Sequence, residues 1–183
     1  DTYKNSKEKF YAVVTNIETG KAEYIEIDDL REEKQMEYLR ASGSMPFVSK
    51  PVCINDKRYL DGGIADSIPI DKIMDMGYDR VIVILTRPED YRKKKSNTFI
   101  PKAYYRQYPD LISAINNRYL IYNQQLEKVN KLEKEKKIFV IRPSRFVDIK
   151  RIERNIEKIQ EMYDLGQEDA VGNLASMLEY LKL

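Results

Sequence analysis

A carboxylate stands directly before two glycines in the run Tyr59-Leu60-Asp61-Gly62-Gly63. The residues before it are predicted to form a short strand, and a carboxylate at a strand end is held in a fixed direction. It could accept a proton from a neighbouring hydroxyl group. Gly62 and Gly63 let the backbone turn tightly and leave space for another segment or a ligand. Asp-Gly is also a common turn signal, so a purely structural role stays open.

Composition excludes several other kinds of site. Among the 183 residues there is no histidine and one cysteine, Cys53, so a Ser-His-Asp triad, a Cys-His pair or a Cys/His zinc site cannot be complete within them. A lone cysteine cannot form an internal disulfide. The net charge of +2 speaks against a dedicated nucleic-acid binder. No apolar run approaches the ~18 residues of a membrane-spanning helix.

The first half of the chain contains two hairpin signals. Residues 10–16 and 22–27 are predicted strands joined by a turn at 18–21, and residues 51–54 and 57–60 are shorter strands joined at 55–56. Between the two hairpins, residues 30–40 carry apolar residues at helical spacing. Within the second hairpin, Cys53 is predicted to be a small core residue.

The rest of the chain alternates helices and strands. Pro69 and Gly77 bracket a short helix, and the apolar run 80–86 (RVIVILT) predicts a central parallel strand covered on both faces. A helix over 109–134, a strand over 137–142 and two closing helices divided at Gly166 follow. The predicted fold class is α/β, with a mostly parallel sheet, flanking helices and a C-terminal helical extension.

The block from Ser42 to Pro69 resembles the bacterial patatin-like phospholipases. The residues that carry the resemblance are A-S-G-S-M-P-F at 41–47, the following hairpin, D-G-G at 61–63 and S-I-P at 67–69. The resemblance implies a serine acyl hydrolase that cleaves lipid esters with a Ser-Asp dyad and no metal or cofactor. By it, Asp61 is the dyad carboxylate and Gly62 and Gly63 support the motif. Residues 1–100 correspond to the C-terminal half of the catalytic domain, and residues 101–183 to a helical extension with one added strand.

The chain departs from the family in one large respect. It contains neither a G-x-S-x-G nucleophile motif nor a glycine-rich oxyanion loop, both of which lie earlier in the family's chains. Together with a first residue that is Asp1, this predicts the C-terminal part of a longer protein, inactive alone, with Asp61 an exposed strand-end carboxylate. A sheet without its first strands should expose apolar surface or cover it with a second copy.

Other polar residues near Asp61 are predicted to be structural. Asp66 and Asp71 stand beside a proline and a helix start, where turn and capping roles are common, and Ser67 is not expected to be a nucleophile. Ser42 and Ser44 follow a helix end, which favours capping.

Two alternative functions remain open at this stage. The basic loop 87–95 and the helical tail could bind a protein partner or a membrane surface without catalysis. Fourteen tyrosines interleaved with basic residues could stack on single-stranded nucleic acid, although the near-neutral charge speaks against this. Each of these possible functions is compatible with a homo-oligomer. Cysteine usage and the bacterial resemblance predict a cytoplasmic protein, peripheral to the membrane if the loop binds lipid.

Overall fold

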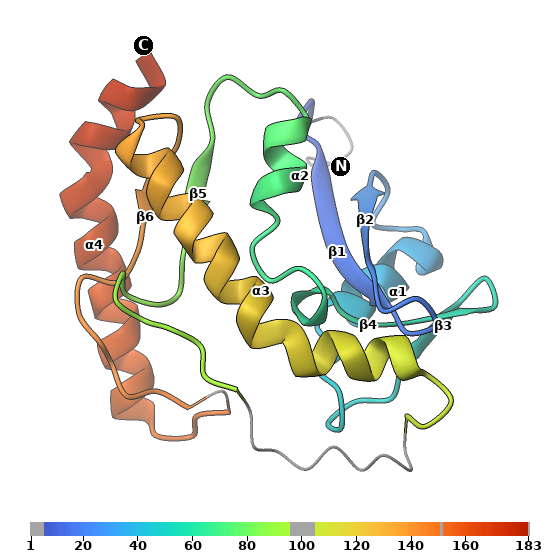
Figure 1. The fold of residues 1–183 in the computed structure, drawn as a ribbon. Coiled ribbons are helices and arrows are strands. Elements are labelled where there is room, and N and C mark those ends of the chain that lie inside the picture. Colours follow the sequence, from blue (N-terminus) through green and yellow to red (C-terminus); the bar gives the residue numbers. More distant parts are fainter. Residues whose placement is uncertain (1–5, 96–104, 151, 183) are drawn as a thin grey trace. The chain divides into compact units, whose positions relative to one another are not determined.

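The computed structural model describes residues 6–95, 105–150 and 152–182, and it divides the chain into two compact units. The first unit comprises residues 1–69 and 93–125, and the second comprises residues 70–92 and 126–183. The long helix α3 (Pro109–Lys134) takes part in both units and begins and ends where its sequence pattern predicts. Figure 1 shows the succession of elements along the chain.

The first unit is built on a four-stranded antiparallel sheet. Its strands are β1 (Phe10–Asn16), β2 (Ala22–Ile27), β3 (Val52–Ile54) and β4 (Lys57–Asp61), in the order β2-β1-β4-β3. Both predicted hairpins are therefore confirmed. The tight turn of the second hairpin uses positive φ at Asn55 and Asp56, a conformation that these two residue types tolerate well.

Strand β4 buries side chains on both of its faces. Tyr59 packs in a cluster with residues of β1, β3 and α1 (Glu33–Ser42), whereas the next residue, Leu60, packs in a second cluster that includes Leu111 of α3. Successive residues of a strand point to opposite faces, so the sheet has two buried sides. The same alternation explains why the prediction for Cys53 was wrong, because its neighbours point inward and Cys53 itself is exposed.

The tyrosine in this core should make the protein sensitive to alkaline pH. Tyr59 is 2% exposed and donates a hydrogen bond to Glu23 at 3.0 Å. Burial, followed by this bond, raises the pKa of Tyr59 above its ordinary value near 10. The unfolded chain therefore loses this proton first, so the stability linked to Tyr59 is present below about pH 10 and falls as pH rises above it.

Urea unfolding of the wild type and of Tyr59→Phe between neutral pH and pH 11 measures this effect. We expect the wild-type midpoint to fall more steeply above pH 10 than the variant's midpoint, because phenylalanine has no proton to lose. Identical slopes in the two proteins would show that Tyr59 ionises equally easily in the folded and unfolded states.

The second unit contains a small parallel sheet. Its elements are α2 (Ile70–Asp75), β5 (Ile82–Ile84), β6 (Phe139–Ile141), residues 126–134 at the C-terminal end of α3, and α4 (Ile156–Lys182). Strands β5 and β6 are parallel neighbours, and β6 contacts α4. Within the described residues the larger sheet is antiparallel, so the prediction of a mostly parallel sheet was wrong. Short hairpin turns reverse the chain, whereas parallel neighbours need a long crossover.

Two further predictions about this unit were wrong. Strand β5 is not covered on both faces, since Ile84 is 73% exposed. An apolar run in the sequence indicates a tendency to be buried, but it does not show whether a neighbouring element is there to cover it. The tail is one helix, α4, that continues through Gly166. A helical glycine costs only about 1 kcal/mol relative to alanine, which the remaining turns of a long helix can offset.

Helix α4 leaves one apolar face exposed. Its exposed apolar residues recur at steps of three, four or eight, and so share one side of the helix: Ile156, Ile159, Tyr163, Val171, Leu174, Leu178 and Leu181. No helix in the described ranges is long and apolar enough to cross a membrane.

Candidate active site around Asp61

Asp61 is the last residue of β4, and its backbone is held on both sides. Its N–H donates a hydrogen bond to the carbonyl oxygen of Ser44 at 2.9 Å, and its own carbonyl accepts one from the Thr15 hydroxyl at 2.9 Å. Asp61 also pairs in register with Val14 of β1. These contacts place the carboxylate at a defined point where the sheet ends.

The carboxylate itself is directed into the turn that follows. Its Oδ1 accepts a hydrogen bond from the Gly63 N–H at 2.7 Å, so the side chain caps the single-turn helix η1 (Gly62–Ile64). Asp61 is half-buried, which corrects the expectation of an exposed carboxylate. The Oδ1 atom of Asp61 thus maintains the turn.

Other atoms approach both glycines of the motif closely, and the approach to Gly62 excludes a side chain there. A Cβ atom on Gly62 would lie 2.3 Å from the carbonyl oxygen of Val13, a distance that no side chain can adopt. A Cβ atom on Gly63 would lie 3.1 Å from Asp61 Oδ1 and 3.2 Å from Nη2 of Arg118. The sequence predicted that another chain segment would approach the glycines, and the segments that do so are β1 and α3.

The loop after the glycines is anchored to α3. Asp66 accepts hydrogen bonds from Gln125 and from the hydroxyl of Tyr24, and Oε1 of Gln125 accepts one from the Ile68 N–H at 3.0 Å. Burial, followed by the bond to Asp66, raises the pKa of Tyr24. Asp66 therefore has more partners than the predicted turn role requires.

The nearby hydroxyl groups have structural partners, as predicted. Ser67 donates to the carbonyl oxygen of Gly63 at 2.7 Å, and Ser44 donates to that of Arg40 at 2.8 Å. Asp71, in the second unit, forms an ion pair with Lys128. In the part of the chain that the structure describes, no group of three or more His, Cys, Asp or Glu residues is arranged to hold a metal ion.

Part of the basic loop 87–95 is engaged with the protein itself. The Arg87 guanidinium lies 5.3 Å from the ring centre of Tyr91 within the second unit. In the first unit, the Lys93 ammonium lies 4.4 Å from the ring centre of Tyr122. Lys94 and Lys95 are exposed. The loop therefore presents fewer solvent-facing charges than its composition indicates.

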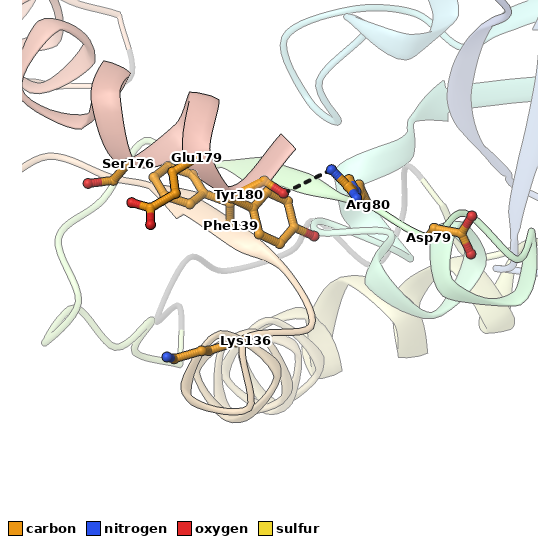
Figure 2. Close-up of a pocket in the computed structure, with 7 residues that line it drawn as sticks. All are labelled: Asp79, Arg80, Lys136, Phe139, Ser176, Glu179 and Tyr180. Carbon is orange, nitrogen blue, oxygen red and sulfur yellow. Dashed lines mark hydrogen bonds between the residues drawn. The ribbon is translucent and has the colours of Figure 1, made fainter. Parts of the chain in front are cut away.

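A separate pocket of about 690 Å³ lies in the second unit (Figure 2). Tyr180 and Glu179 of α4, Phe139 of β6 and Lys136 line it, and Arg80 donates a hydrogen bond to the carbonyl oxygen of Tyr180 at 3.2 Å. Two acidic and two basic residues line it, so its charge favours neither anionic nor cationic ligands. Asp61 does not line this pocket.

Sequence reasoning missed Arg118 and the partners of Asp66. Both Arg118 and Gln125 lie beside the apolar stripe that predicted α3, at positions where a helix facing only a hydrophobic core would carry apolar residues. Arg118 and Gln125 are polar and stand seven positions apart on that face, and this spacing is the sequence feature that could have identified them.

Comparison with known families assigns the two ends of the chain separately. Residues 2–74 match the family model of patatin-like phospholipases, and this match contains Asp61, Gly62 and Gly63. Residues 108–182 match a domain of unknown function, DUF6363. None of the curated proteins matches the chain. The first match supports a relation to a family of lipid acyl hydrolases, and hence to carboxylic ester hydrolases.

Proposed function

We propose that these residues form the C-terminal part of a bacterial patatin-like serine acyl hydrolase and supply Asp61 as the base of its Ser-Asp dyad. The single observation that carries the proposal is the placement of Asp61, half-buried at a strand end and anchored through three hydrogen bonds, inside the segment that matches the family. Gly62 and Gly63, which have no side chains, allow β1 and α3 to approach the motif closely. The serine and the oxyanion loop belong to a preceding segment of the longer protein.

The proposed chemistry needs no metal or cofactor. The serine Oγ attacks the ester carbonyl carbon while its proton passes to the Asp61 carboxylate. The ester bond to the alcohol then breaks, and the departing alcohol takes up that proton. Water repeats the sequence on the acyl-enzyme, releasing the fatty acid and regenerating the serine. Because Asp61 accepts the proton directly, the absence of histidine from these residues is compatible with this route.

An ester assay on the full-length gene product tests the proposal. We expect the full-length protein to hydrolyse a chromogenic short-chain ester and to be labelled by a fluorophosphonate on a serine outside residues 1–183. The 183 residues alone are expected to show neither property. Full-length protein that is inactive on every ester and takes up no label would contradict the proposal.

A second candidate is a non-catalytic module that binds a partner or a membrane surface, and the exposed apolar face of α4 favours it. The charged residues of α4 are mostly acidic, which weakens attraction to anionic lipid. Sedimentation of the protein alone, compared with co-sedimentation with lipid vesicles, separates self-association from membrane binding. A cytoplasmic location, peripheral to a membrane if lipid binding is found, remains part of this proposal.

A further inference from the structure

We infer that Arg118 is a substrate-specificity residue of the Asp61 site, and that its guanidinium binds the phosphate group of a phospholipid ester. This inference rests on the proposed function, since it assigns a ligand to the same site. It also assigns a role in that site to a residue of the DUF6363 segment, because residues 108–182 include Arg118 and the patatin-like match ends at residue 74.

The position of Arg118 relative to Asp61 is the first observation. The point where a Gly63 side chain would begin lies 3.2 Å from Arg118 Nη2 and 3.1 Å from Asp61 Oδ1. The guanidinium and the carboxylate therefore both lie close to Gly63, on the side where a side chain would project. All three residues belong to the first compact unit.

The second observation is that one face of α3 is held against the motif. Leu111, Arg118 and Gln125 are spaced by seven residues, which places them on the same side of a helix. Leu111 is fully buried in the cluster that contains Leu60 and Ile64, on either side of Asp61. Gln125 accepts the Ile68 N–H and donates to Asp66. Arg118 lies between these two anchors.

The anchoring makes Arg118 a placed cation and not a solvent-facing one. Its side chain is half-buried, and its Nε atom is shielded from solvent. A guanidinium with restricted motion loses less entropy when it binds an anion, and its fork of N–H groups matches two oxygens of a phosphate.

The chemistry of the substrate determines which anion fits. In a glycerophospholipid the phosphate is separated from the neighbouring ester oxygen by only a few bonds. When the ester carbonyl lies at a serine within hydrogen-bonding reach of Asp61, the phosphate of the same molecule can lie near the residues around that carboxylate. A cation beside Asp61 is therefore placed to bind the phosphate of the same molecule, and an uncharged ester gains nothing from it.

The test compares two esters that share their acyl chains and differ in the phosphocholine group, which contains the phosphate. The full-length wild type and Arg118→Met are assayed on dihexanoylphosphatidylcholine and on dihexanoylglycerol. We expect Arg118→Met to lower kcat/KM for the phospholipid by ~10- to 100-fold, the range of a charge-assisted hydrogen bond, and to change that for dihexanoylglycerol by less than ~3-fold. Arg118→Lys should recover part of the loss. Arg106→Met, which removes an exposed arginine just before α3, is the matched control.

Equal losses on the two esters would overturn the inference and would make Arg118 a positioning residue for Asp61. Unchanged activity on both esters would overturn it as well. Equilibrium binding of the phospholipid to the Asp61→Asn protein, with and without Arg118→Met, gives a readout that needs no turnover. A protein that binds the phospholipid through Arg118 but cleaves no ester would refute the proposed function and leave the Arg118 assignment standing.

Discussion

Full-length protein with Asp61→Asn is expected to lose ester hydrolysis by ~10²- to 10⁴-fold in kcat, the range that a positioned general base contributes. Asparagine is nearly the same size as aspartate, and its Oδ1 can still accept the Gly63 N–H that Asp61 accepts at 2.7 Å. The turn should therefore survive while the proton acceptor for the serine is lost. Initial rates on a chromogenic ester, with circular dichroism to confirm folding, measure the effect.

Asp56→Asn is the matched control for this substitution. Asp56 is exposed, lies in the turn of the same hairpin and has a positive φ that asparagine tolerates well. We expect it to leave kcat unchanged. If Asp61→Asn folds and keeps full activity, Asp61 is a turn residue and the assignment of the base is wrong.

The second large effect concerns stability. Gly62→Ala should lower the free energy of unfolding by about 3 kcal/mol, corresponding to a fall in melting temperature of about 6–12 °C. The new Cβ would overlap the Val13 carbonyl, with 2.3 Å to its oxygen and 2.4 Å to its carbon. These are backbone atoms of β1, so relief requires β1 and β4 to separate. Thermal unfolding followed by circular dichroism measures the change.

Gly172→Ala provides the opposite case within the same chain. Gly172 lies inside α4, and nothing is within 4 Å of the position that its Cβ would occupy. Alanine is the better helix former, so this variant should gain up to about 1 kcal/mol. A Gly62→Ala protein as stable as the wild type would show that the strand contact can relax, and that the glycine is not required there.

Local sequence features predicted the elements correctly where neighbouring residues decide the outcome. Turn residues between apolar segments located both hairpins, and Pro109 together with a helical stripe located α3. The Asp-Gly-Gly motif identified Asp61 as the candidate carboxylate from its residue types alone. Each of these features depends on contacts within a few residues along the chain, and local propensity describes such contacts well.

Other properties depended on which distant segments meet. The mostly parallel sheet was mispredicted because the residue pattern of a strand does not say which strands become its neighbours: among the described residues only β5 and β6 pair in parallel, whereas both hairpins join the larger, antiparallel sheet. Ile84 is exposed because burial requires a packing partner, which periodicity cannot supply. The two glycines predicted that another segment would approach the backbone closely, but only the tertiary structure identified β1 and Arg118 as the groups that do so. The sequence by itself determined that a carboxylate, Asp61, stands at a strand end before two glycines. The packing of α3 against the motif decided which cation accompanies it, because contacts between residues far apart in the chain form only when the whole unit folds.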